Sequence, residues 1–167
     1  MMGEQCVEAP MKTEGLLNSD LIAVIARIGH GDMIVITDRG FPFPIHSLTK
    51  TLDLSVVRNI PRFLDVVKPV VEESEFESII LAEEMKTENT ETHQNLIDII
   101  KKQEKNERKI SIKYIPHDEF KDLVLHGAER GDPVVCMIKT GEFSPYANII
   151  LTSGVPFFKS TDPPAPS

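Results

Sequence analysis

Apolar residues recur along this chain at two spacings, and the two spacings alternate. Helical spacing predicts helices over residues 21–28, 61–73, 90–103 and 117–125. Short runs rich in β-branched residues predict strands over residues 33–37, 78–82, 110–115, 134–139 and 148–152. Strands that alternate with helices of this length are typical of an α/β fold. We therefore expect a single three-layer α/β/α domain with a mostly parallel, mixed central sheet.

Local residues set the limits of these elements. Asn18 offers N-cap chemistry to the first helix, and Gly29 ends that helix. Pro69 should kink the second helix or end it early, because proline lacks the N–H of a helical residue. The strands at 134–139 and 148–152 are too close for a helical crossover. They either pair antiparallel or lie apart in a mixed sheet.

The two ends of the chain differ in character from its middle. Residues 1–14 have no apolar core and are expected to form a flexible N-terminal extension. Residues 159–167 contain three prolines and are expected to form a disordered tail. The folded domain is therefore predicted to span residues 15–158.

Charge and composition exclude several classes of protein. The net charge is −8, from 26 acidic and 18 basic residues, which argues against a nucleic-acid partner. No apolar run approaches the roughly 20 residues that span a bilayer, so we expect no membrane association. Two cysteines make a disulfide framework and a cysteine-rich zinc site improbable. The start of the chain does not resemble a secretory signal, so the cytoplasm is the expected location.

The segment around His30 is the most informative for chemistry. His30 follows a predicted helix, on backbone that Gly29 and Gly31 leave free to turn. Its imidazole exchanges protons near neutral pH, and Asp32 is a residue that would orient it. Asp38 ends a buried strand, where ligands of α/β sheets gather. The alternative, that His30 caps the helix and Asp38 caps a turn, stays open from these residues alone.

Two later segments carry further polar side chains. His117 opens a helix directly after a strand, and Tyr146 and Asn148 lie in a turn before a strand. A phenol hydroxyl and an amide suit the binding of sugar hydroxyls. Two alternatives to a binding role stay open. His117 is then an ordinary residue of the first helical turn, and Tyr146 is a buried residue of a structural turn.

The remaining polar features indicate no second site. Glu83 and Glu84 form either a paired-carboxylate site or, more commonly, a solvated loop. His93 and His126 are expected to face solvent on helices, and His46 has no evident partner. The chain contains no P-loop, G-x-G-x-x-G, H-E-x-x-H or G-x-S-x-G motif. These absences count against a nucleotide-dependent enzyme, a zincin and a serine hydrolase.

Six short motifs stand out along the chain. They are LNSD at 17–20, RIGHGD at 27–32, Asp38 with GFPFP at 40–44, LAEEMK at 81–86, HDEFK at 117–121, and TGEFSPYANIIL at 140–151, with Gly154-Val155 following. These motifs resemble those of one family, the D-ribose pyranases or ribose mutarotases. Each motif is weak alone, but together they run in family order from about residue 15 to residue 157. By this resemblance the chain is identified as a member of that family.

The resemblance implies an isomerase that needs no cofactor and no metal. His30 matches the family's catalytic histidine. The matches to sugar-binding positions are Asp38, His117, Tyr146, Ala147 and Asn148. The implied reaction interconverts pyranose, furanose and anomeric forms of a free monosaccharide, D-ribose. The implied assembly is a homo-oligomeric ring, a decamer or similar, in which the neighbour's C-terminal segment completes each site.

Acid/base chemistry fits these residue types. Opening a cyclic hemiacetal requires one proton to leave the anomeric hydroxyl and one to reach the ring oxygen. We expect His30 to donate to the ring oxygen, with Asp32 tuning it, while water or Asp38 takes the hydroxyl proton.

Some residues depart from the ribose type. Arg39 stands where ribose members usually have alanine, and the loop at 45–51 is longer than usual. Phe41 and the pair His46-Ser47 resemble the sister L-fucose mutarotases. The alternatives are therefore a mutarotase for L-fucose or another sugar, a non-catalytic monosaccharide-binding protein, and a protein whose only function is assembly.

Overall fold

A computed structural model describes residues 11–104 and 109–155. The helices are α1 (Ser19–Arg27), α2 (Phe63–Glu72), α3 (Met85–Glu88), α4 (Thr90–Gln103) and α5 (His117–His126), with a 3₁₀ turn at Ala128–Arg130. The strands are β1 (Met33–Thr37), β2 (Lys50–Asp53), β3 (Phe76–Ala82), β4 (Ser111–Ile115), β5 (Val134–Lys139) and β6 (Ile149–Ser153). Within these residues no helix is long and apolar enough to cross a membrane.

The described strands form one mixed sheet in the order β2-β5-β1-β6-β3-β4. β1 pairs in parallel with β5, β5 with β2, and β3 with β4. β6 runs antiparallel to both of its neighbours, β1 and β3. Because β1 lies between β5 and β6, these two strands are not paired. Of the two alternatives offered by the sequence, the one in which they lie apart in a mixed sheet is confirmed. This confirms the predicted α/β fold with a mostly parallel, mixed sheet.

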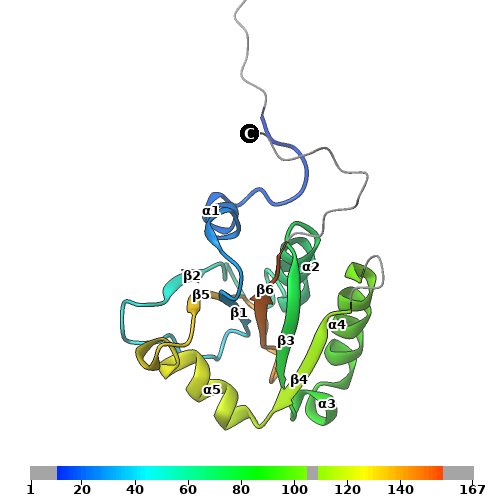
Figure 1. Cartoon of the computed structure of the whole chain (residues 1–167). Coiled ribbons are helices and arrows are strands. Elements are labelled where there is room, and N and C mark those ends of the chain that lie inside the picture. Colours follow the sequence, from blue (N-terminus) through cyan, green and yellow to red (C-terminus); the bar gives the residue numbers. More distant parts are fainter. Residues whose placement is uncertain (1–10, 105–108, 156–167) are drawn as a thin grey trace, which may run out of the picture.

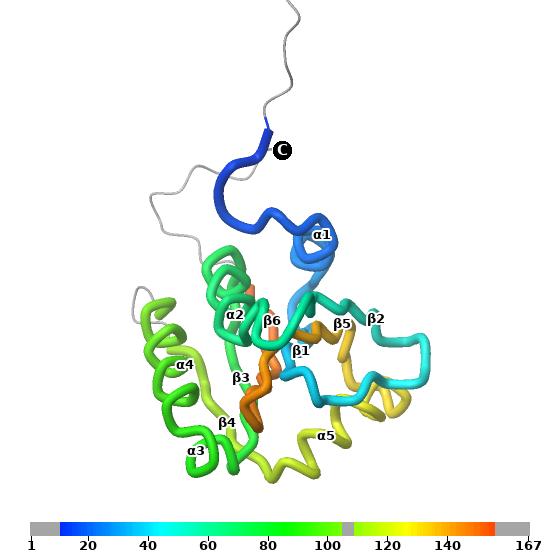
Figure 2. Tube along the Cα trace, turned by 180° about the vertical axis from the view of Figure 1, so that it is seen from behind, coloured from blue at the N-terminus to red at the C-terminus, as the bar shows by residue number. Residues whose placement is uncertain are grey.

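Helices cover both faces of the sheet (Figures 1 and 2). Alternate residues of β1 face opposite sides: Ile34 and Ile36 pack in the core that includes α1, α2 and α4, whereas Val35 packs with α5. All three side chains are fully buried. Burial on both faces explains why β1 reads as a continuous apolar run.

Most predicted element limits agree with the structure. Asn18 caps α1, because its side-chain oxygen accepts hydrogen bonds from the N–H groups of Asp20 and Leu21, both at 3.0 Å. Strand β1 and helix α4 have the predicted bounds. The extension and tail stay predictions, since residues 1–10 and 156–167 lie outside the described residues and residues 11–14 form no helix or strand.

Three features of the fold differ from the sequence-based expectation. Strand β2 went unpredicted because Leu52 is its one buried residue, and α3 because it spans a single turn. Pro69 was expected to kink α2 or to end it early, and the early end does not occur, since α2 continues to Glu72. Val66, Val67, Val70 and Val71 are all buried around Pro69, and their packing outweighs the cost of proline in a helix.

Replacing a buried leucine should cost far more stability than replacing an exposed one. Leu81 in β3 is fully buried, whereas Leu48 is 63% exposed. We expect Leu81→Ala to lower the free energy of unfolding by about 2–5 kcal/mol. Leu48→Ala, the matched control, should change it by no more than about 0.5 kcal/mol. Urea unfolding measures both, and equal losses would contradict this placement of the core.

Candidate active site

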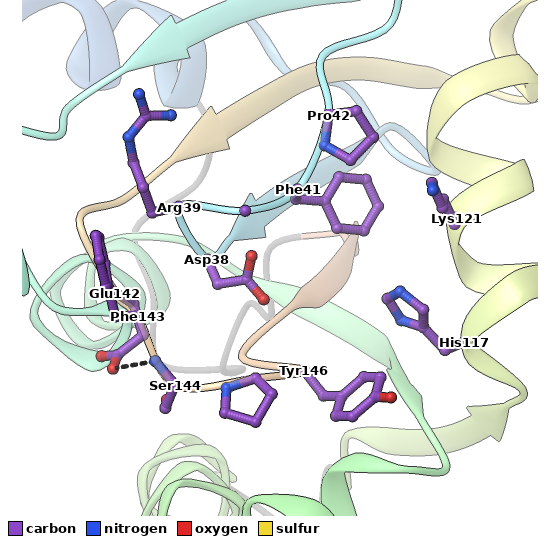
Figure 3. Close-up of a pocket in the computed structure, with 12 residues that line it drawn as sticks. Asp38, Arg39, Phe41, Pro42, His117, Lys121, Glu142, Phe143, Ser144 and Tyr146 are labelled. Carbon is purple, nitrogen blue, oxygen red and sulfur yellow. Dashed lines mark hydrogen bonds between the residues drawn. The ribbon is translucent and has the colours of Figure 1, made fainter.

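A pocket of about 420 Å³ opens where β1 ends and β6 begins. The residues that line it are Asp38, Arg39, Gly40, Phe41, Pro42, His117, Lys121, Glu142, Phe143, Ser144, Pro145 and Tyr146. In Figure 3 the Asp38 carboxylate and the His117 ring face one another across the pocket. The Tyr146 ring lies beside His117 with its hydroxyl directed away from Asp38, and Arg39 also points away from Asp38. Three of the five predicted sugar-binding residues therefore line one cavity.

Asp38 is held by a fourth predicted residue, Asn148. The backbone N–H of Asp38 donates to Asn148 Oδ1 at 2.9 Å, and Asn148 Nδ2 donates to Asp38 Oδ2 at 3.3 Å. Asn148 itself is fully buried. This reciprocal pair joins the residue after β1 to the residue before β6 and fixes the orientation of the carboxylate.

Burial raises the pKa of the Asp38 carboxyl above its ordinary value of 3.8. The Asn148 amide, the backbone N–H groups of Phe41 and Gly40, and the charge of His117 act in the opposite direction and only partly offset burial. A carboxyl group whose pKa moves toward neutrality exchanges protons more readily near pH 7. Asp38 is thus suited to proton transfer as well as to hydrogen bonding.

His117 is fixed through both its backbone and its ring. Its backbone N–H donates to the two carboxylate oxygens of Glu84, at 2.9 and 3.2 Å. The ring makes edge-on contacts with Phe41 and Tyr146, with centroids 6.2 and 5.0 Å apart. Among the described residues, His117 Nδ1 is buried without a hydrogen-bond partner. A buried imidazole nitrogen without a partner is costly unless a ligand uses it.

Tyr146 has a left-handed backbone conformation, which glycine adopts more readily than other residues. Its φ is +57°, and its carbonyl accepts a hydrogen bond from the N–H of Asn148 at 2.9 Å. Such a conformation typically costs about 1–3 kcal/mol and is retained where the surroundings impose it. Ala147, which follows, is fully buried and lines no part of the pocket. The turn therefore directs the Tyr146 ring into the cavity and leaves Ala147 in the core.

His30 lies at the opposite edge of the sheet from this pocket. It precedes β1, whereas Asp38 follows it, and a five-residue strand spans about 16 Å at roughly 3.3 Å per residue. His30 Nε2 lies 3.1 Å from Glu77 Oε2. Asp32, the residue expected to orient His30, instead accepts a hydrogen bond from the N–H of Gly29 at 2.8 Å. Within one chain the predicted catalytic histidine is thus separate from the predicted sugar-binding residues.

Nine of the twelve lining residues were not singled out from the sequence as site residues, Lys121, Glu142 and Phe41 among them. Lys121 lies one helical turn after His117, an i,i+4 spacing that could have indicated it. Glu142 is buried, and its carboxylate accepts hydrogen bonds from the N–H groups of Phe63 and Ser144, both at 3.2 Å. Phe41 is buried beside His117. Glu142 and Phe41 fall within the motifs at 140–151 and 40–44, but local spacing does not indicate their contacts with Phe63 and His117, which come from distant segments.

The other polar residues have structural roles. Glu84 binds the start of α5, and Glu83 is exposed, so the two form no paired-carboxylate site. His126 is exposed as predicted, but His93 is half-buried against Tyr114, with its Nε2 2.8 Å from the phenol oxygen. His46 Nε2 lies 3.0 Å from the carbonyl oxygen of Leu125. Residues 11–104 and 109–155 contain no cluster of histidine, cysteine and acidic side chains that could hold a metal.

The raised pKa of Asp38 predicts a pH-dependent difference between the wild type and Asp38→Asn. Asp38 keeps its proton to higher pH in the folded protein than in the unfolded chain. Its contribution to stability is therefore full below pH 3.8 and is lost as the pH rises through the folded pKa. The free energy of unfolding of Asp38→Asn minus that of the wild type should rise over this interval. Urea unfolding across pH measures it, and a flat or falling difference would contradict the raised pKa.

Comparison with known proteins shows which proteins this chain resembles. The chain is 44% identical to the D-ribose pyranase of Pectobacterium atrosepticum and 41% identical to that of Aliivibrio fischeri. Each match covers 148 residues, which is 88% of this chain and 100% of the relative.

Solved structures agree with the sequence comparison. Bacillus subtilis RbsD complexed with D-ribose has 38% identity and a TM-score of 0.73, over 88% of this chain and 100% of that one. The fucose mutarotase of Streptococcus pneumoniae in complex with L-fucose has the same fold, with 23% identity and a TM-score of 0.62, over 84% and 94%. The RbsD / FucU transport protein family matches residues 11–156. This chain is a member of the RbsD / FucU family.

Proposed function

We propose that this protein is a mutarotase that interconverts the pyranose and furanose forms, and the anomers, of D-ribose. The observation that carries the proposal is the pocket that holds Asp38, His117 and Tyr146 at the edge of the sheet. The relatives named D-ribose pyranase match over their whole length at 41–44% identity, and the relative complexed with D-ribose has 38% identity. The product is an isomer of the substrate, so no co-reactant is required.

The pocket supplies the groups that hemiacetal opening requires. Asp38 accepts the proton of the anomeric hydroxyl, because Asn148 holds its carboxylate toward the cavity. His117 and Tyr146, which line the pocket, bind other sugar hydroxyls through the imidazole and the phenol. Closure through a different hydroxyl returns the protons, so the cycle leaves every group as it began.

His30 is the proposed donor to the ring oxygen, and it comes from a neighbouring copy. His30 cannot reach the pocket of its own chain, because the length of β1 separates the two. A contact between the His30 edge of one copy and the pocket edge of the next joins two different surfaces. Such head-to-tail contacts close into rings when the rotation allows it. The proposed homo-oligomer therefore shares each site between two subunits.

The remaining finer points stay predictions. These are the decamer, the cytoplasmic location and the neighbour's C-terminal segment, of which residues 156–167 lie outside the described residues. L-Fucose is the second candidate substrate, because Phe41, which contacts His117, and His46-Ser47 resemble the fucose type. The identity of 23% to the fucose mutarotase against 41–44% to the D-ribose pyranases favours ribose.

Magnetisation-transfer NMR on equilibrated D-ribose tests the proposal. The wild type should accelerate exchange between pyranose and furanose signals, and Asp38→Asn and His30→Ala should each lose about 10²-fold or more, since a positioned acid or base contributes about that much. Glu72→Ala, on the exposed face of α2, is the control and should retain the wild-type rate.

Parallel runs with L-fucose separate the candidates. Acceleration of fucose alone would transfer the proposal to that sugar. Saturable binding of ribose without acceleration of either sugar would identify a binding protein and contradict the proposed catalysis.

A further inference from the structure

The loop that carries His30 is held rigidly although the side chain is exposed. The N–H of Gly31 donates to the carbonyl of Ser153 at 2.9 Å, and the N–H of Ser153 donates to the carbonyl of Asp32 at 2.9 Å. The Ser153 hydroxyl donates to the carbonyl of Gly29. Gly31 has a φ of +87°, a conformation that glycine adopts without strain. The end of β6 thus fixes the backbone on both sides of the histidine.

The imidazole of His30, in the loop before β1, has a specific partner on strand β3. Its Nε2 lies 3.1 Å from Oε2 of Glu77, on β3, and the two side chains are 58% and 42% exposed. β6 lies between β1 and β3, so the pair reaches across the end of β6. The carboxylate of Asp32 is engaged by the N–H of Gly29 at 2.8 Å. Among the described residues, Glu77 is the carboxylate that the structure pairs with His30.

We propose that Glu77 is a positioning residue for proton transfer by His30. Its carboxylate accepts the Nε2–H hydrogen bond and fixes the rotation of the ring, so that Nδ1 is the nitrogen left to face a sugar. This inference rests on the proposed function, in which His30 donates to the ring oxygen. In this step the imidazolium form of His30 gives the Nδ1 proton to that oxygen as the C–O bond breaks, which leaves a neutral ring whose Nε2–H stays on Glu77. Nδ1 recovers a proton from the attacking hydroxyl when the ring closes.

The contribution of the pair to stability is small, so its two roles can be separated. Exposed pairs of this kind contribute little to the stability of a fold. Losing the Glu77 carboxylate should therefore leave the protein folded. By contrast, an exposed imidazole without a partner rotates among several orientations, and proton transfer requires one of them. The effect of Glu77 should consequently appear in turnover rather than in folding or sugar affinity.

Three variants test the role of Glu77 in the full-length protein. Glu77→Ala should lower kcat for D-ribose exchange by about 10- to 100-fold, a part of what a positioned acid or base contributes, with KM within about twofold. Glu77→Gln should recover most of the lost rate, because its amide oxygen still accepts the Nε2–H bond. Glu72→Ala removes a carboxylate of similar exposure, 46%, from an ion pair with Lys68 and should behave as the wild type.

The outcomes separate this inference from the proposed function. Wild-type kcat in Glu77→Ala would overturn it, as would equal damage in Glu77→Ala and Glu77→Gln with a raised KM or a lowered unfolding temperature. His30→Ala is measured beside them. If His30→Ala retains full turnover, the assigned role of His30 fails, and that of Glu77 with it. If His30→Ala is inactive while Glu77→Ala is unaffected, the role of Glu77 alone fails.

Discussion

The reciprocal hydrogen bonding between Asp38 and Asn148 is the constraint on which the pocket depends. It joins the end of β1 to the start of β6, two segments that are 110 residues apart in the chain. Because Asn148 is fully buried, its amide would be left without a hydrogen-bond partner at a cost in free energy if it released the carboxylate. The same residue accounts for the neighbouring backbone, since its N–H bonds the carbonyl of Tyr146, whose φ is positive. Asn148 thus orients the Asp38 carboxylate through its side chain and holds the Tyr146 backbone through its own N–H.

The sheet distributes the proposed chemistry between its two edges. Asp38, His117 and Tyr146 lie at the carboxyl end of β1, and His30 lies before its start. Each edge is organised by β6: its first residues adjoin the Asp38 pair, and Ser153 at its end holds the His30 loop. Being antiparallel to β1, this strand connects both edges through one short rigid element. This placement at opposite edges is the physical reason for the head-to-tail association proposed above.

Local patterns predicted much of this arrangement and missed contacts that span the chain. The N-cap at Asn18 and the apolar run of β1 are local, and both were predicted correctly. Strand β2 has one buried residue, Leu52, and gave no period to detect. The roles of Glu77 and Asn148 arise from pairs 47 and 110 residues apart, which no local spacing indicates. The separation of His30 from Asp38 could have been inferred from the sequence, because the predicted five-residue strand lies between them.

The central claim, that each site is shared between two copies, is tested most directly by mixing two inactive variants. His30→Ala and Asp38→Asn subunits would be unfolded together, refolded, and compared with each variant treated alone. If sites form between neighbours, random mixing should restore about one quarter of the wild-type exchange rate, because one interface in four then joins an intact His30 to an intact Asp38. Mixed assemblies of wild-type size whose rate stays at the average of the two variants would contradict the shared site.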